Sequence, residues 1–546
     1  MLPSIPHATV PDLLNHVCDQ FAQQPCLAMY GSTTQTYAQL HANVRRMAGQ
    51  LDALGVQSHS RVLIMLENSP HVIHTWLAVN FINAIDVGIN TGYRGQTLEH
   101  AVSVSEAKLM VTFSHHLDVI AGSAQKLGQL QTILVLDAVA DAHGSSPVVA
   151  QLENAGIRVV MADELPIGDD CPKVSVAPAD IASVIFTSGT TGSAKGVQMP
   201  HAQVCLLAQR SARKTGLTQD DIFYSFYPMY HMAGKFMSVL ATFSVGGKVV
   251  MDTSFRPECW LSRIRETGAT ATAAHGPMLE MVFAQPPASN DRDHALRVVR
   301  TAPFPKRIAT QFEARFGVRG LEVWGMTEIG IASWSDISKP LVVGSCGRVD
   351  TEFFEFAVVD PATDMPVPTG TMGEFVIRPR YPWTIMQGYL GMPDKTVEAW
   401  RNLWFHTGDC GWINEDGQVF FGDRRSERIR RRAENISASD IEAIALEHPA
   451  IAEAMALGVD SGFESDDDIL LCIVPSDAHA VEYETLLSYL AQHLPHYMVP
   501  RYLVFMESLP RTATGKLQRG AMRATLPGLS LWDRKANNVS LRALRA

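Results

Sequence analysis

Residues 181–196 read IASVIFTSGTTGSAKG, an apolar run followed at once by a turn rich in hydroxyl groups and glycine. The apolar part, Ala182 to Phe186, is typical of a short buried β-strand. The turn consists of Thr187, Ser188, Gly189, Thr190, Thr191, Gly192, Ser193, Ala194, Lys195 and Gly196. Glycines let successive backbone N–H groups converge on an anion, hydroxyl groups add donors, and the lysine adds a positive charge. The segment therefore predicts a phosphate-binding loop after a buried strand.

Two other interpretations of this turn are weaker. A Walker A loop is excluded, because the pattern GxxxxGK[ST] does not fit the residues. A flexible Ser/Gly surface loop stays open as the alternative, but such loops rarely follow a buried strand with so many hydroxyl groups.

On both sides of the loop, helical patterns alternate with short apolar runs. Residues 37–56 have helical periodicity and reach a plausible helix end at Gly55, and the runs RVLIML (61–66) and KLMVTF (108–113) look like strands. The alternation continues at residues 181–186, 248–251, 296–301 and 320–323. This order predicts one large layered α/β body that reaches about residue 420.

The composition changes after that body. Residues 421–440 are dense in Arg and Glu, and a helix-like segment (441–449) and a strand-like segment (469–475) follow. We therefore expect a large domain over residues 1–424, a small α+β domain over 425–525, and a polar, basic tail over 526–546. The tail is expected to form a terminal helix or to be disordered.

Composition and charge restrict the partners and the location. The formal net charge of the 546 residues is −11 with mixed signs along the chain, so nucleic acid is not an expected partner. The eight cysteines show no CxxC or Cys/His ligand spacing, which fits a reducing cytoplasm. The first residues lack the features of a secretion signal, and polar residues interrupt the most apolar stretch (72–89), so we expect a soluble protein without a membrane span.

Further motifs follow the loop in a fixed order: VWGMTEIG at 323–330, WFHTGD at 404–409 and LPRTATGKL at 509–517. With the loop, they resemble the adenylate-forming superfamily of acyl-CoA synthetases, nonribosomal-peptide adenylation domains and beetle luciferases. The likeness extends from about residue 36 to residue 523. It implies a large multi-layered N-terminal adenylation domain and a small mobile C-terminal lid domain.

The resemblance assigns the nucleotide site residue by residue. Thr301, Ala302 and Pro303 match the adenine-binding turn, with Thr301 in place of a common glycine, and Trp324 stands where an aromatic residue stacks near adenine. Gly325, Met326 and Thr327 complete that motif, and the loop residues Thr187 to Gly192 and Lys195 take the phosphates. Asp409 matches the carboxylate that accepts hydrogen bonds from both ribose hydroxyls, a pairing that suits an ionised acceptor.

Metal, hinge and catalytic roles also follow from the resemblance. Glu328 matches the Mg2+ ligand, and a carboxylate with the Thr187 hydroxyl suffices for a cation that shares substrate phosphates; taken alone, Glu328 would be a capping or solvated residue. Arg424 aligns with a nucleotide-binding arginine and Glu427 with the hinge position, and an exposed charged linker is compatible with both. Lys516 is the expected catalytic lysine, which bridges the substrate carboxylate and the α-phosphate.

The motifs say less about which acid is activated and which thiol accepts the acyl group. His231 aligns with the aromatic-histidine step of acyl-CoA synthetases and is assigned to position the carboxylate, which disfavours an α-amino acid. Residues 255–260 and 434–437 resemble the carnitine/crotonobetaine-type branch. Two departures are Ala433, where relatives have a glycine that lines the pantetheine tunnel, and Gly88, where a proline is common.

The sequence thus predicts an AMP-forming acid–thiol ligase that uses ATP, Mg2+ and a small-molecule carboxylic acid and transfers the acyl group to CoA. The alternative is a stand-alone adenylating enzyme that loads the phosphopantetheine arm of an acyl carrier protein. A protein that binds a nucleotide or acyl group without turnover is disfavoured, because Thr187, Glu328, Asp409, Arg424 and Lys516 are all present.

Overall fold

The computed structural model describes the chain except residues 1–4, 138–145, 166–170, 188–193, 425–428, 432–433, 437, 464–465, 477–481, 511–517, 543 and 545–546, and the side chains of 423, 424, 434, 435 and 439. Contacts divide the chain into two units. The first holds residues 1–91, 101–186 and 196–423, and the second holds 92–100, 187–195 and 424–546. The predicted α/β class, with a large N-terminal domain and a smaller C-terminal one, is confirmed.

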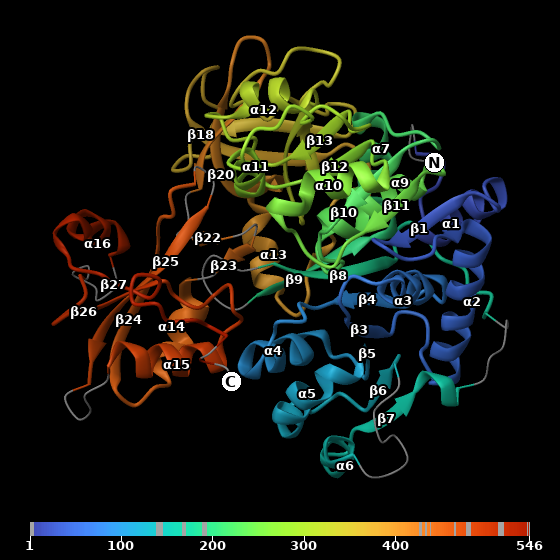
Figure 1. The fold of residues 1–546 in the computed structure, drawn as a ribbon, viewed down its shortest axis with the longest axis horizontal. Helices are drawn as coiled ribbons and strands as arrows, with labels where there is room; N and C mark the ends of the chain where they lie inside the picture. The colour runs from blue at the N-terminus through green and yellow to red at the C-terminus, as the bar shows by residue number, and fades with distance from the viewer. Residues whose placement is uncertain are drawn as a thin grey trace. The chain divides into compact units, whose positions relative to one another are not determined.

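One sheet of the first unit contains the strand before the loop. Its order is β19-β9-β8-β4-β3-β5-β6-β7, and the strands from β8 to β7 run parallel. The bounds are β3 (Arg61–Met65), β4 (Ile85–Gly88), β5 (Leu109–Thr112), β6 (Thr132–Val135), β7 (Arg158–Met161), β8 (Ile181–Thr187), β9 (Lys195–Pro200) and β19 (Gly388–Tyr389). Because parallel strands end at a common edge, the segments after β3 and β5 leave the sheet on one side (Figure 1).

A second sheet in the same unit has the order β16-β15-β14-β13-β12-β10-β11-β1-β2. Its strands are β1 (Pro25–Met29), β2 (Gln35–Thr36), β10 (Ile222–Ser225), β11 (Lys248–Met251), β12 (Ala271–Ala273), β13 (Val298–Thr301), β14 (Arg319–Met326), β15 (Gly330–Trp334) and β16 (Arg348–Val349). The strands from β1 to β14 run parallel, whereas β15 turns back antiparallel on β14. The predicted adenine turn therefore begins at the end of β13, and the VWGMTEIG motif covers the end of the neighbouring strand β14 and the turn to β15.

Helix α3 (Pro70–Phe81) explains the most apolar stretch of the sequence. It packs against β3 and β4 of the first sheet and against β1 of the second, so every residue from Val72 to Phe81 is buried. Two of its polar residues are paired inside: the amide of Asn80 donates to Ala182 O at 2.7 Å, and His74 lies 3.0 Å from the amide oxygen of Gln35. The segment is a helix between two sheets.

Further helices in the described residues before the C-terminal segment lie around these sheets (Figure 1). They are α1 (Val10–Gln20), α2 (Tyr37–Ala53), α4 (Gly95–Ser105), α5 (Leu117–Ser123), α6 (Pro147–Asn154), α7 (His201–Thr215), α8 (Met232–Gly234), the π-helix η4 (Lys235–Leu240), α9 (Ala241–Phe243), α10 (Pro257–Thr267), α11 (Gly276–Phe283), α12 (Ala309–Phe316) and α13 (Pro393–Ala399). Short 3-10 turns are η1 (Ser114–His116), η2 (Ala124–Lys126), η3 (Ala162–Glu164) and η5 (Arg401–Leu403). Helix α2 begins in a capping box in which Thr36 and Gln39 bond reciprocally, as its sequence favours.

A third sheet of the first unit, β17-β18-β20-β21, carries the WFHTGD motif. Its strands are β17 (Phe354–Val359), β18 (Gly373–Pro379), β20 (Phe405–Ile413) and β21 (Val419–Arg424). Strands β17, β18 and β20 pair antiparallel. The motif therefore begins at Trp404, just before β20, and continues into the first residues of that strand.

The second unit packs helices on both faces of one sheet. Strands β24 (Ile451–Asp460), β25 (Asp467–Pro475), β26 (Tyr502–Phe505) and β27 (Trp532–Asp533) form it, and β22 (Ile429–Arg431) pairs with β23 (Glu434–Ile436) beside it. Alternate residues of β24 and β25 face α14 (Ala438–Leu446) and α15 (Tyr483–His493) on one side, and α16 (Arg519–Thr525) on the other. This period of two is what a strand with two buried faces requires.

The end of the chain differs from the expectation. After η6 (Leu526–Gly528), strand β27 pairs antiparallel with β26, although a helix or disorder was expected. The reason is local: Trp532 stacks on Tyr483, and Asp533 accepts hydrogen bonds from Arg501 at 2.8 and 3.1 Å. An aromatic contact and a bidentate ion pair offset the polar character of this segment.

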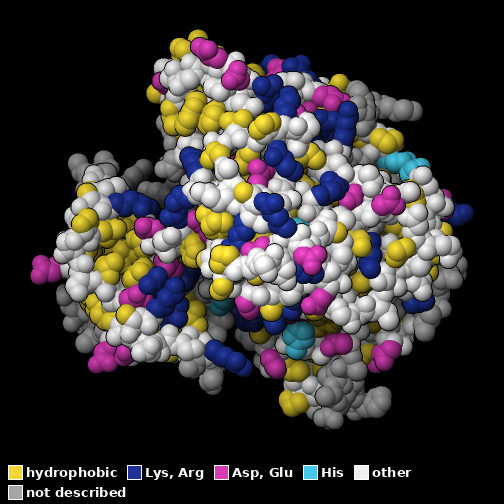
Figure 2. All heavy atoms as spheres, turned by 45° about the horizontal axis from the view of Figure 1, so that its top comes forward, with side chains coloured by type: hydrophobic (Ala, Val, Ile, Leu, Met, Phe, Trp, Pro, Cys, Tyr) yellow, Lys and Arg dark blue, Asp and Glu magenta, His cyan; other side chains and the backbone are white. Residues whose placement is uncertain are grey.

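The surface of the first unit shows mixed charge. On the face drawn in Figure 2, Lys and Arg side chains are interspersed with Asp and Glu. None of the helices in the described ranges combines the length and the apolar character that a bilayer crossing requires.

Candidate active site

The fold brings together two residues that the motifs assign to the nucleotide. The indole Nε1 of Trp324, on β14, donates a hydrogen bond to Asp409 Oδ2, on β20, at 2.9 Å. Asp409 is 2% exposed, and the ring of Trp324 packs edge-on against Phe356 and Phe375. The tryptophan at this position therefore has a polar role as well as an aromatic one, because its N–H stabilises a buried carboxylate.

The predicted adenine turn lies at the end of β13. Thr301 Oγ1 donates to Pro303 O at 2.9 Å and so closes the turn on itself, and the Ala302–Pro303 peptide is cis. His275 Nδ1 lies 3.3 Å from Ala302 O, and the His275 ring meets Tyr227 edge-on. The threonine that replaces the usual glycine thus supplies a hydroxyl that holds the turn.

Glu328 lies in the turn between β14 and β15. The turn is tight, because a Cβ at Gly325 would collide with Gly330 O and Ile331, so glycine is required there. The Gln203 amide donates to the carbonyls of Thr327 and Glu328 at 3.0 and 3.2 Å, which fixes the backbone.

The carboxylate of Glu328 is buried, contrary to the alternative of a capping or solvated residue. It is 3% exposed, and its Oε1 accepts a hydrogen bond from the Tyr389 phenol at 2.9 Å. Burial raises the pKa of Tyr389, and the nearby charge of Glu328 raises it further. The phenol therefore stays a hydrogen-bond donor at neutral pH.

His231 stands at the N-terminus of a short helical segment that continues into the π-helix η4. Its ring lies 4.7 Å from the ring of Tyr230, and its carbonyl accepts from the Lys235 backbone N–H at 3.0 Å. A Cβ at Gly88 would lie 3.1 Å from Tyr230 Cα. Glycine in place of the common proline thus lets this segment approach β4 closely.

Lys235 and Asp86 form a buried ion pair that the motifs did not indicate. They are 1% and 0% exposed, and the Asp86 Oδ2 that Lys235 contacts also accepts from Ser183 Oγ at 2.7 Å. Burial lowers the pKa of Lys235, and Asp86 opposes that shift. The sequence hinted at this pair only through Asp86, one of the polar residues that interrupt the apolar stretch 72–89.

Arg300 is a second buried cation that the sequence did not reveal. Its guanidinium donates to Met237 O at 2.6 Å and to Ser238 Oγ at 3.0 Å, both in η4. Burial lowers its pKa to about 10, so it stays charged at neutral pH. Because Arg300 precedes Thr301, it ties the π-helix after His231 to the strand that ends in the predicted adenine turn.

The remaining predicted residues fall in the second unit or outside the described residues. Thr187 Oγ1 donates to Lys195 O at 3.5 Å, so the two ends of the loop meet across the β8–β9 turn. Arg424 ends β21, and its side chain is outside the description. Ser188, Gly189, Thr190, Thr191, Gly192, Glu427, Ala433 and Lys516 lie outside the described residues.

Comparison with known families agrees with this arrangement. Residues 14–390 match the model of the AMP-binding enzyme family, and residues 440–516 match that of the AMP-binding enzyme C-terminal domain. The first match covers more than half of the chain. The chain therefore belongs to the AMP-binding enzyme family, and the family that its motifs indicate is confirmed.

Individual relatives narrow the comparison. The chain is 29% identical over 494 residues to a crotonobetaine/carnitine–CoA ligase of Shigella flexneri, which covers 89% of this chain and 92% of the relative. Among solved structures, an o-succinylbenzoate CoA synthetase from Bacillus subtilis is 22% identical with a TM-score of 0.78, over 95% of this chain and 99% of that one. An amide bond synthetase from Marinactinospora thermotolerans is 22% identical with a TM-score of 0.79, over 94% and 99%. These two structures establish likeness of fold.

Proposed function

We propose that this chain is an AMP-forming acid–thiol ligase, an acyl-CoA synthetase. It joins ATP and a small-molecule carboxylic acid to an acyl-adenylate with release of pyrophosphate, and then transfers the acyl group to CoA, leaving AMP. The observation that carries the proposal is the Asp409 carboxylate, which is 2% exposed and held by Trp324. An ionised carboxylate accepts several hydrogen bonds, and the two hydroxyls of a ribose are donors of the right kind.

The neighbouring residues have chemistry that suits the rest of the nucleotide. The turn Thr301 to Pro303 and the motif Trp324 to Thr327 belong to adjacent strands and form the adenine wall in this proposal. In this proposal the loop of Thr187 to Gly192 with Lys195 takes the phosphates, and Arg424 is a further nucleotide-binding residue.

Mg2+ fits the oxygen donors assigned to it. Glu328 is a buried carboxylate oriented by Tyr389, and a carboxylate has more acceptor positions than one phenol uses. Thr187 adds a hydroxyl oxygen, and hard oxygen ligands shared with substrate phosphates are what this cation prefers. When bound, Mg2+ would neutralise charge on the phosphates.

The carboxylate of the acid attacks the α-phosphate while Lys516 holds the two groups in line and offsets the charge that builds between them. His231 positions the acid. The small domain then rotates near Glu427, withdraws Lys516 and lets the thiol reach the acyl carbonyl, so that one site serves both half-reactions.

CoA is the proposed acceptor because the relative that is similar over most of both chains is named as a CoA ligase. The fold alone does not select a thiol, since its neighbours include an amide bond synthetase. A carrier-protein phosphopantetheine stays the alternative acceptor.

The cytoplasmic location and the absence of nucleic-acid binding stay predictions from the sequence.

The test is pyrophosphate release from Mg-ATP across a panel of small and medium carboxylic acids, with and without CoA. The panel includes crotonobetaine and carnitine because the relative is named for them. We expect release with at least one acid and acyl-CoA when CoA is present. Lys516→Ala should abolish release, whereas Lys339→Ala, at a lysine with a 66% exposed side chain, should not.

Two results would change the proposal. Release of pyrophosphate without capture of the acyl group by CoA would make a carrier protein the acceptor. Failure of every acid to release pyrophosphate would contradict adenylation itself.

A further inference from the structure

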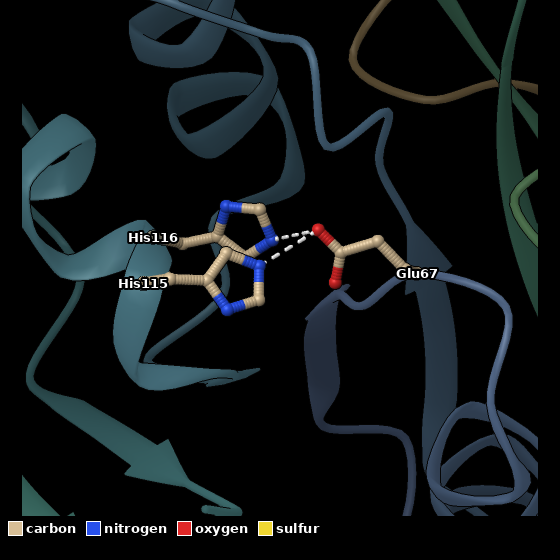
Figure 3. Close-up of side chains that lie close together, drawn as sticks. All are labelled: Glu67, His115 and His116. Carbon is tan, nitrogen blue, oxygen red and sulfur yellow. Dashed lines mark hydrogen bonds and ion pairs between the residues drawn. The ribbon is translucent and has the colours of Figure 1, made fainter. Parts of the chain in front are cut away.

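One carboxylate and two consecutive imidazoles from distant parts of the sequence meet at the carboxyl edge of the parallel sheet. Strands β3 and β5 are neighbours, with Met65 paired to Thr112. Glu67 follows β3 by two residues, and His115 and His116 follow β5 in the turn η1. The register therefore places one carboxylate opposite two consecutive imidazoles, as Figure 3 shows.

The ring nitrogens converge on a single oxygen. Nε2 of His115 and Nε2 of His116 lie 2.9 and 2.7 Å from Glu67 Oε1 (Figure 3). His116 is 4% exposed, and its Nε2 has no partner with hydrogen-bond geometry; the other carboxylate oxygen of Glu67 is also buried without a partner. Atoms of three residues that can each bind a metal ion thus lie close together.

The convergence on Glu67 Oε1 fits two kinds of bonding. The two imidazole rings are 4.2 Å apart, and both turn Nε2 towards the same carboxylate oxygen. Neutral imidazoles in the Nε2–H tautomer can donate hydrogen bonds to that oxygen. A divalent cation at the common point would use the same three groups, because it binds neutral imidazoles and an ionised carboxylate together.

The supporting contacts hold the ligand atoms in place. Asp137 accepts hydrogen bonds from the backbone N–H and the hydroxyl of Ser114 at 2.6 and 2.8 Å, which fixes the start of η1. Phe113 stacks on the ring of His115, and Ser69 Oγ donates to the Glu67 carbonyl at 3.1 Å. Such outer contacts orient the ligands of metal sites.

A second cluster in the described part of the chain serves as a contrast. Asp364, Glu374 and His406 also offer close ligand atoms, but Arg401 donates to Asp364 at 3.1 and 3.2 Å and to Glu374 at 3.1 Å. A guanidinium therefore already supplies the positive charge there. Among the described residues, the ion-pair partners of Glu67 are the two histidines.

We propose that Glu67, His115 and His116 bind a divalent transition-metal ion of the Zn2+ class. A tetrahedral ion holds its ligand atoms about 3.3 Å apart at Zn–N and Zn–O bonds near 2.0–2.1 Å, so the site needs to open by only a few tenths of an ångström. The His115 side chain is 58% exposed, and water completes the coordination on that side. The ion would join the β3–α3 turn to η1.

The test is a calorimetric titration of Zn2+ into the full-length protein without an affinity tag, in excess Mg2+ so that hard-oxygen sites stay filled. Glu67→Gln and His115→Gln remove one ligand each, and neither leaves a hole because Glu67 is half-exposed and His115 exposed. His59→Asn, at an exposed histidine of the same unit, is the matched control. Co2+ absorption in parallel reports the coordination geometry.

We expect one Zn2+ per chain for wild type and His59→Asn, and affinity at least about tenfold lower for both ligand variants. Absence of Zn2+ binding to wild type would overturn the proposal. So would binding that is unchanged in both variants, which would point to the cysteines instead.

Discussion

Asp409 is the residue on which nucleotide binding depends most in this account. Asp409→Asn keeps the shape and removes the charge, and a hydrogen bond to a charged group contributes about 1.5–3 kcal/mol. We therefore expect kcat/KM for ATP to fall about tenfold to a hundredfold. Steady-state kinetics at saturating acid measures this, and an unchanged KM for ATP would contradict the ribose assignment. Trp324→Phe, which removes the indole donor but keeps an aromatic ring and the charge of Asp409, should have a smaller effect.

Tyr389 is expected to tune the carboxylate of Glu328. Tyr389→Phe removes its hydrogen bond and leaves a buried carboxylate with one donor fewer, at a cost of about 1–3 kcal/mol. The Mg2+ concentration needed for half-maximal pyrophosphate release should shift in this variant, and Glu328→Gln should lose most activity. If Glu328→Gln responds to Mg2+ as wild type does, Glu328 is not a ligand.

The sequence could predict the motif residues but not their partners. Trp324, Asp409 and Glu328 are found in short patterns with a fixed order, so single positions identify them. Arg300 and Tyr389 act through contacts that span 61 to 63 residues, and no local pattern records such a pairing. The Trp324–Asp409 hydrogen bond joins positions 85 residues apart and required the fold as well.

Among the elements, β4 and the π-helix η4 depend on the Asp86–Lys235 pair. Asp86→Asn leaves the ammonium of Lys235 buried without its counter-charge, and breaking one side of a buried pair costs about 3–5 kcal/mol. Chemical denaturation should show a loss of this size. The double variant Asp86→Asn/Lys235→Met should recover part of it, and additive losses would contradict the coupling.

His201, in helix α7, is expected to make the free energy of unfolding depend on pH. This residue is fully buried, and burial lowers its pKa from 6.5 to about 3. A depressed folded-state pKa means that stability is fully present above pH 6.5 and is lost as pH falls towards 3, because the unfolded chain takes up the proton first. Between pH 7 and 5 the loss is about 2 kcal/mol for this one group.

His201→Gln keeps an acceptor for the Val10 N–H and removes the titration. Urea denaturation of wild type and variant at pH 7 and pH 5 should therefore show a smaller acid loss in the variant, by about 2 kcal/mol. Equal losses in the two proteins would mean that His201 is protonated in the folded state.

The periodicity and length of apolar runs predicted the strands well where neighbouring residues alone determine the element. The strand expected at 248–251 is β11, and the apolar run 181–186 is β8. The end of the chain was the failure, because Trp532 and Asp533 gain order from Tyr483 and Arg501, which lie far away in the sequence. Tertiary contacts overrode the local polar pattern there.

The whole chain is expected to catalyse two half-reactions, adenylation and thiol transfer, that depend on different residues. Lys516→Ala should block pyrophosphate release yet still convert synthetic acyl-adenylate and CoA to acyl-CoA, because the lysine serves only the first step. Ala433→Gly should leave pyrophosphate release unchanged and speed thiol capture, because it removes the methyl group expected to narrow the path of the thiol. Single-turnover assays of each half-reaction measure both, and equal loss of both steps in Lys516→Ala would contradict the division.

The most direct test of the ligase follows the oxygen atoms. A carboxylic acid accepted by the enzyme is labelled with heavy oxygen in its carboxyl group and incubated with Mg-ATP, CoA and wild-type protein, and the products are analysed by mass spectrometry. Attack of the carboxylate on the α-phosphate predicts one labelled oxygen in AMP together with acyl-CoA. Label in inorganic phosphate, or unlabelled AMP beside acyl-CoA, would contradict the acyl-adenylate.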